Sequence, residues 1–175
     1  MRLAHLQHME TATMLIRRGM RISIVSSITG INPKILRVLH HDIHGRGPVA
    51  GQLPSTGGIL STRTMQATAS VFASLYRSVG GPGILDGINL DALITAHDLY
   101  LEFCRSMTTI TPNTLPINIT QAWIIARDIG IGAAYFRNCH HCRIHYLLPD
   151  DSSLSPTCPI CALKKRGSGQ PLTMD

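Results

Sequence analysis

The sequence predicts a mainly α-helical protein that ends in a small cysteine-rich module. Helical patterns of apolar residues recur from residue 6 to about residue 136, separated by loops rich in Gly and Pro. Strand signals occur only after Cys139, in the part that holds two pairs of cysteines. These observations predict a helical body over residues 1–136, a four-cysteine zinc-binding module over 137–166 and a tail over 167–175.

Three helices are predicted before residue 45. The first covers residues 6–20, and its last turn holds Arg17, Arg18 and Gly19, since cations favour the negative end of a helix dipole and Gly stops a helix. The second and third helices cover residues 21–28 and 33–44. Residues 45–58 contain too many Gly and Pro residues for a helix or a strand, so a loop is expected there.

Three further helices are predicted in the rest of the body. Ser61 is the expected cap of a helix that runs to about Ser78 and ends at the Gly-rich segment 80–83. Asn89 is the expected cap of a helix over residues 90–105. A last helix is expected from Thr120 to about Phe136.

The charge of the chain is unevenly distributed. The formal net charge is +6, with a pI of about 9.4, and Arg outnumbers Lys by 13 to 3. Residues 1–77 hold nine basic and two acidic residues, whereas residues 78–128 hold two basic and five acidic ones. Basic ends around an acidic middle favour a protein that binds a polyanion, with nucleic acid as the first partner to consider.

Membrane spanning and secretion are not expected from this sequence. The chain has no run of 18 apolar residues, and its first ten residues include His, Gln and Glu, which interrupt any apolar signal region. A cytoplasmic protein is therefore expected.

An enzyme is not expected either. The one candidate pair is His97 with Cys104, which lie seven residues apart on one helix and so about 10 Å apart along its axis. This separation is too long for proton transfer. Cys104 is therefore interpreted as a packing residue.

The cysteines of the C-terminal module have the spacing of a zinc site. Cys139 and Cys142 are separated by two residues, as are Cys158 and Cys161, and fifteen residues lie between the pairs. Two residues between cysteines let both sulfurs converge on one metal ion, and the long insert brings the second pair opposite the first. Four thiolates leave no open coordination position, so the sequence predicts one structural Zn²⁺ per chain.

Residues 21–44 have the pattern of a helix-turn-helix unit. Gly30 suits a tight turn, Asn32 caps the following helix and Pro33 opens it. Ile35, Leu36 and Leu39 are expected to face inward. The opposite face would carry a stripe of donors for DNA, formed by Lys34, Arg37, His41 and His44. A helical hairpin with a solvated polar face is the alternative.

Several blocks of the sequence, in this order, resemble the FlhC family of flagellar regulators. They are Leu15–Arg21, Gly45–Pro48 followed by Leu53-Pro54, Leu99–Cys104, Thr120–Trp123 and the four cysteines. The resemblance implies a transcriptional activator of flagellar operons that binds promoter DNA and acts through RNA polymerase. It also implies assembly with an FlhD-like subunit into a heterohexamer of four FlhD and two FlhC chains, and it assigns the four cysteines as zinc ligands.

The candidate residues for the two macromolecular partners follow from charge and from helix faces. A partner surface is expected on the helix that begins near Ser61. Two other functions stay open: a zinc-stabilised module that binds only protein, and a diverged relative that regulates genes other than flagellar ones. The DNA candidates are Arg17, Arg18, Arg21, Lys34, Arg37, His41, Lys164, Lys165 and Arg166, and the partner candidates are Met65, Phe72, Leu75 and Tyr76.

Overall fold

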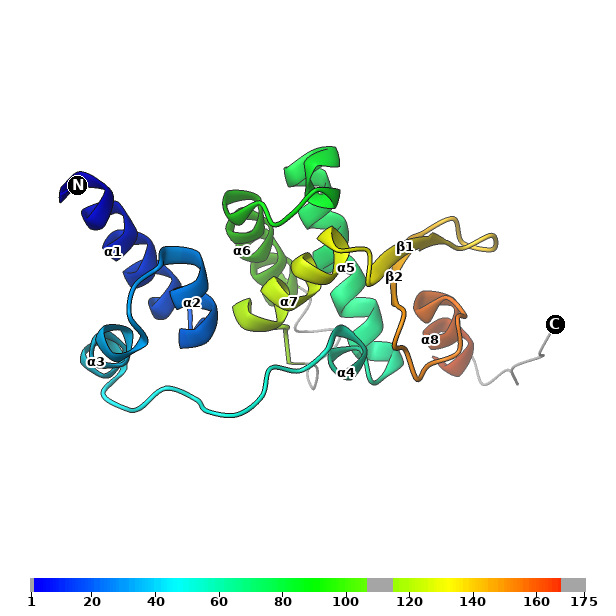
Figure 1. The fold of residues 1–175 in the computed structure, drawn as a ribbon. Coiled ribbons are helices and arrows are strands. Elements are labelled where there is room, and N and C mark those ends of the chain that lie inside the picture. The colour runs from blue at the N-terminus through cyan, green and yellow to red at the C-terminus, as the bar shows by residue number, and fades with distance from the viewer. Residues whose placement is uncertain (1, 107–114, 168–175) are drawn as a thin grey trace. The chain divides into compact units, whose positions relative to one another are not determined.

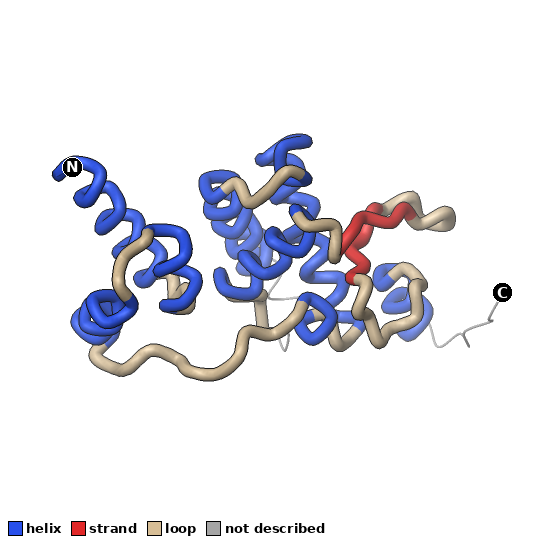
Figure 2. The backbone as a smooth tube through the Cα atoms, viewed as in Figure 1, coloured by secondary structure: helices blue, strands red, loops and turns tan. Residues whose placement is uncertain are grey.

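The computed structural model describes residues 2–106 and 115–167, which form two compact units (Figures 1 and 2). The first unit contains the described residues up to Leu53 together with Asn118–Thr120. The second contains the other described residues from Pro54 onward. The cysteine-rich end therefore lies in the same compact unit as the described helices that follow Leu53.

The first unit is a bundle of three helices. Helix α1 spans Arg2–Arg17, α2 spans Ile22–Thr29 and α3 spans Pro33–His44, and each contacts the other two. Gly30 ends α2 with a left-handed φ of 69°, which a side chain would disfavour. Asn32 caps α3, since its side-chain oxygen accepts a 2.9 Å hydrogen bond from the Lys34 N–H. The core side chains include Leu15, Ile16, Ile24, Val25 and Leu36.

Two histidines of α3 stabilise this bundle through hydrogen bonds. His44 Nε2 donates a 2.8 Å hydrogen bond to the carbonyl of Ile16, near the end of α1. His40 Nδ1 donates a 3.1 Å hydrogen bond to the carbonyl of Arg46, in the segment after α3. The Ile16 carbonyl also accepts a 2.8 Å hydrogen bond from the Gly19 N–H, and Arg46 lies just beyond the end of α3. The C-terminal turn of α3 is thereby fixed to α1 and to the following segment.

The second unit is organised around α5 (Arg63–Gly80). This helix contacts α6 (Leu90–Ser106), the 3₁₀ helix η1 (Gly81–Leu85) and two elements of the cysteine-rich end. Its N-cap is Thr62, whose hydroxyl accepts a hydrogen bond from the Met65 N–H. The expected cap, Ser61, is one residue too early. Phe72, Tyr76, His97 and Tyr100 form an aromatic cluster between α5 and α6, with ring centroids about 6 Å apart.

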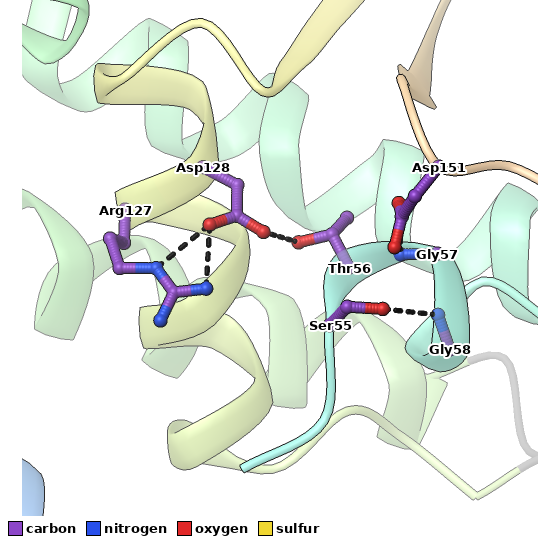
Figure 3. A network of polar contacts seen from close by, with 7 residues as sticks. All are labelled: Ser55, Thr56, Gly57, Gly58, Arg127, Asp128 and Asp151. Atoms are coloured by element: carbon purple, nitrogen blue, oxygen red, sulfur yellow. Dashed lines mark hydrogen bonds and ion pairs between the residues drawn. The ribbon is translucent and has the colours of Figure 1, made fainter.

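A short helix, α4 (Thr56–Ile59), opens the second unit and is held from two sides (Figure 3). The Thr56 hydroxyl donates a 2.6 Å hydrogen bond to Asp128 of α7 (Ile119–Gly130), and Asp128 also pairs with Arg127 at 2.7 Å. Asp151 accepts a 3.0 Å hydrogen bond from the Gly57 N–H. This helix overlaps the end of the segment predicted as a loop, residues 45–58, because Ser55 caps it by accepting a hydrogen bond from the Gly58 N–H.

A two-stranded antiparallel sheet follows α7. Strand β1 spans Ala134–Asn138 and pairs with β2, His145–Pro149, from Ala134 opposite Pro149 to Asn138 opposite His145. The predicted helix to Phe136 is therefore wrong beyond Gly130. Gly130 ends α7, and Gly132, at a left-handed φ of 74°, turns the chain into the strand. The first strand also precedes Cys139, whereas strands were expected only after it.

Helix α8, Pro159–Gly167, ends the described part of the chain and packs on α5. No helix within residues 2–106 and 115–167 is both long and apolar enough to cross a membrane.

Candidate functional site

The four predicted ligands converge into one cluster. All four sulfur atoms lie within 4.8 Å of one another. The Cys139 and Cys161 sulfurs are 3.8 Å apart, and the Cys142 and Cys158 sulfurs are 3.7 Å apart. A tetrahedron with metal–sulfur bonds of about 2.3 Å has edges of about 3.8 Å. These two distances therefore suit one tetrahedrally coordinated ion, and the cluster could hold a metal.

The two cysteine pairs reach this arrangement from different local structures. Cys139 and Cys142 lie in the loop between β1 and β2, where the Arg143 N–H donates a 2.7 Å hydrogen bond to the Cys139 carbonyl. Arg143 adopts a φ of 60°, which is uncommon for a residue with a side chain and closes the turn tightly. Cys158 and Cys161 lie at the start of α8, where a helix N-terminus favours negatively charged sulfur.

Hydrogen bonding and burial act on the thiols in opposite directions. The backbone N–H of Cys142 is the main cause that lowers the pKa of Cys139 to about 7. Burial raises the pKa of Cys158, and it raises the pKa of Cys161 to about 12. A metal binds thiolates, so metal binding near neutral pH must displace protons from this cluster.

Polar side chains of α5 support the cysteine cluster, and sequence reasoning missed them. Arg63 donates hydrogen bonds to the carbonyls of Ser155 and Thr157, just before Cys158, at 2.9 and 3.0 Å. Gln66 donates to the Leu147 carbonyl, and the Leu147 N–H donates to Ser70, so β2 is also fixed to α5. The available signal was the spacing of Gln66 and Ser70, two polar residues one turn apart on an otherwise apolar face.

The outward face of α3 carries three of the predicted DNA-contact residues. Lys34, Arg37 and His41 are all exposed, and they follow one side of the helix at spacings of three and four. His44 was also expected in this stripe, but it is half-buried and bound to the Ile16 carbonyl. The stripe therefore consists of Lys34, Arg37 and His41.

Ile35 was expected to face the core of the first unit, but its side chain is exposed. Ile35 is 51% exposed, whereas Leu36, its neighbour, is fully buried. The side chain of an α-helix turns by about 100° per residue, so two adjacent positions cannot both face a narrow core. Val38 is 63% exposed on the same outward face.

The other predicted DNA-contact residues differ in their exposure to solvent. Arg17 is exposed and Arg18 is half-buried at the end of α1. Arg21 is half-buried, and its guanidinium donates to the carbonyls of Gly51, at 2.9 Å, and Val49, at 3.4 Å. Within α8, Lys164 is exposed and Lys165 is half-buried, and the side chain of Arg166 lies outside the described part.

Two of the four residues predicted for the partner surface on α5 are buried within the chain. Phe72 and Tyr76 are both fully buried: Phe72 packs edge-on against His97 and Tyr100 of α6, and the Tyr76 hydroxyl accepts a hydrogen bond from the Asn89 N–H. Their apolar face forms the core of the second unit. Met65 and Leu75 are half-buried.

Comparison with known proteins identifies relatives over most of the chain. The family model described as "Flagellar transcriptional activator (FlhC)" matches residues 2–171. A flagellar transcriptional regulator FlhC of Yersinia enterocolitica is 29% identical over 158 residues, which are 87% of this chain and 79% of that protein.

Two further relatives carry the same name and come from other bacteria. The protein of Gallionella capsiferriformans is 28% identical over 80% of this chain and 74% of its own length. The protein of Cupriavidus metallidurans is 25% identical over 95% of this chain and 76% of its own length. Since the family model covers nearly the whole sequence, this chain belongs to the FlhC family of flagellar transcriptional activators.

Proposed function

We propose that this chain is a DNA-binding subunit of a transcriptional activator that binds promoters of flagellar operons. The observation that carries this proposal is the exposed stripe of Lys34, Arg37 and His41 on the second helix of a helix-turn-helix unit. In that motif the second helix lies in the major groove of DNA. Residues 1–53 include seven basic and only two acidic residues, so the whole unit attracts phosphate groups.

The metal of the cysteine cluster is proposed to be a structural Zn²⁺, one per chain. Soft thiolate ligands in a tetrahedron favour zinc or iron–sulfur chemistry over the hard cations Mg²⁺ and Ca²⁺. Four protein ligands complete the coordination shell, which suits a structural ion rather than a catalytic one. Cys139, Cys142, Cys158 and Cys161 would hold the ion, and it would fix the β1–β2 loop to the start of α8.

The chain is proposed to act in a complex with an FlhD-like subunit and with RNA polymerase. The resemblance to the FlhC family implies four FlhD-like and two FlhC-like chains. Leu99 and Phe103 are 44% and 45% exposed and lie one turn apart on α6, so they favour a protein partner on this helix. Met65 and Leu75 remain candidates for the same interface.

Catalysis is not part of the proposed function. A transcriptional regulator family is not a class of enzymes. The histidine considered above, His97, is buried, and its Nε2 donates a 3.0 Å hydrogen bond to the Ile117 carbonyl. This contact supports a structural role for His97.

Binding of promoter DNA at several salt concentrations tests the proposal. The chain would be purified together with its FlhD-like partner, and its affinity would be compared for a flagellar promoter and for a scrambled duplex of equal length. We expect tighter binding to the promoter and a steep loss of affinity with salt, because phosphate contacts release counterions. Equal and negligible binding to both duplexes would contradict the proposal and favour a module that binds only protein.

A further inference from the structure

The outward face of α3 exposes two branched apolar side chains between its charged ones. Ile35 is 51% exposed and Val38 is 63% exposed. They are three positions apart on one helix, so their side chains are neighbours on its surface. The core of the first unit does not use them, because Leu36 and His40 are the buried residues of α3.

The charges around this pair favour a polyanion over an apolar protein groove. Lys34 precedes Ile35, and Arg37 precedes Val38, so each apolar side chain has a cation beside it in the sequence. Asp42 is the one acidic residue in the sequence of α3, and it lies in the last turns of the helix. In a helix-turn-helix unit the N-terminal residues of the second helix contact base edges, and Lys34–Val38 belong to the first turns of α3.

Thymine offers the apolar group that such a pair can contact. In the major groove each base edge presents donors and acceptors, and thymine adds its 5-methyl group. Apolar side chains in the groove contact that methyl group, while Lys and Arg bind phosphates or guanine.

We propose that Ile35 and Val38 contact thymine 5-methyl groups and thereby select thymines at defined positions of the promoter. This inference rests on the proposed function, because it requires α3 to lie in the major groove. Lys34, Arg37 and His41 then supply affinity through phosphates and polar base edges, and the two apolar side chains supply specificity for thymine. Burial of one methyl group predicts a loss of about four-fold in affinity when that methyl group is removed.

Replacement of thymine by uracil removes the methyl group alone and leaves base pairing intact. A flagellar promoter fragment that carries uracil at random thymine positions would be incubated with the complex of this chain and its FlhD-like partner. Bound and free fragments would be separated and cleaved at uracil. We expect uracil to be depleted from the bound fraction at one or two thymines of the binding site.

The same measurement on variants assigns each methyl group to a side chain. With Ile35→Ala or Val38→Ala, we expect the depletion of uracil to disappear at the thymine that the replaced side chain contacts and to persist at any other. Ile131→Ala and Val49→Ala are the matched controls, since these side chains are 70% and 71% exposed and lie outside α3. Both controls are expected to show the same uracil depletion at each thymine as the unchanged chain.

The possible outcomes separate this inference from the proposed function. If the unchanged chain binds the promoter with the expected salt dependence but shows no uracil-sensitive thymine, the inference is wrong and the proposed function stands. The inference is also wrong if Ile35→Ala and Val38→Ala leave the profile unchanged, or if they release the FlhD-like partner, which would identify this face as a protein interface. Failure of the unchanged chain to bind the promoter would overturn both.

Discussion

The hydroxyl of Thr56 lies 2.6 Å from the carboxylate of Asp128, which is 72 residues further along the chain. Figure 3 shows this hydrogen bond, and both residues are buried, so the bond is shielded from water. Asp128 is also paired with Arg127, which satisfies its second oxygen. The start of the second unit is therefore fixed to α7 by a charged group.

Asp128→Ala is expected to destabilise the second unit. The change leaves the Thr56 hydroxyl without its acceptor and Arg127 without its ion pair, so the free energy of unfolding should fall by about 2 kcal/mol. Urea unfolding followed by circular dichroism measures this loss. Asp86→Ala is the control, because Asp86 is exposed, and it should change the stability by less than about 0.5 kcal/mol. Equal stability of the two variants would show that the Thr56–Asp128 bond contributes nothing.

Gly57 and Gly58 are adjacent but should respond differently to substitution. A Cβ atom at Gly57 would overlap the Asp151 carboxylate and lie 2.7 Å from its backbone oxygen, whereas the nearest atom to a Cβ at Gly58 is 3.6 Å away. Gly57→Ala should therefore lower the free energy of unfolding by about 1–3 kcal/mol. Gly58→Ala should leave it unchanged or raise it slightly. A thermal melt that ranks the two variants in the opposite order would contradict this account of α4.

Arg21 is expected to hold the segment that follows α3. Its guanidinium bonds to the Val49 and Gly51 carbonyls, so Arg21→Ala should make this segment more accessible to elastase, which cleaves after small residues. Arg17→Ala is the control, since Arg17 is exposed. Digestion would be followed by mass spectrometry of the fragments. Equal cleavage rates in both variants would show that the Arg21 contacts do not restrain the segment.

Removal of one cysteine of the cluster should release the metal. Cys142→Ala leaves three sulfurs, so we expect loss of zinc and loss of order in the β1–β2 loop and at the start of α8, which the ion would join, while β2 stays bonded to α5. Cys104→Ala is the matched control, because Cys104 lies on α6 outside the cluster. Elemental analysis of the purified proteins measures the metal. A Cys142→Ala protein that retains one zinc per chain would contradict the assignment.

Local signals in the sequence predicted much of this molecule. The turn at Gly30 and the cap at Asn32 depend on backbone conformation and one nearby donor, and the helices that they separate are confirmed. The C-x2-C spacing likewise restricts each pair of sulfurs to one side of a short turn, and the four sulfurs do converge.

Features that depend on distant contacts could not be predicted in the same way. Residues 134–136 suit a helix or a strand by composition, and their pairing with β2 decides for the strand. Ile35 is apolar, which favours the core, but Leu36 occupies the buried face and leaves Ile35 exposed. The burial of Phe72 and Tyr76 depends on the packing of the second unit around α5, which the sequence alone does not reveal.

The central claim is that α3 binds promoter DNA through Lys34 and Arg37, and the salt dependence of binding tests it most directly. Affinity for a flagellar promoter would be measured at several salt concentrations for the complex with the FlhD-like partner, carrying Lys34→Ala, Arg37→Ala or the control Arg105→Ala. For each α3 variant that loses a phosphate contact, we predict weaker binding. The slope of log affinity against log salt concentration should also be smaller in magnitude by about one unit, while the control keeps the slope of the unchanged chain. Full affinity and an unchanged slope in the Lys34→Ala and Arg37→Ala double variant would contradict the claim.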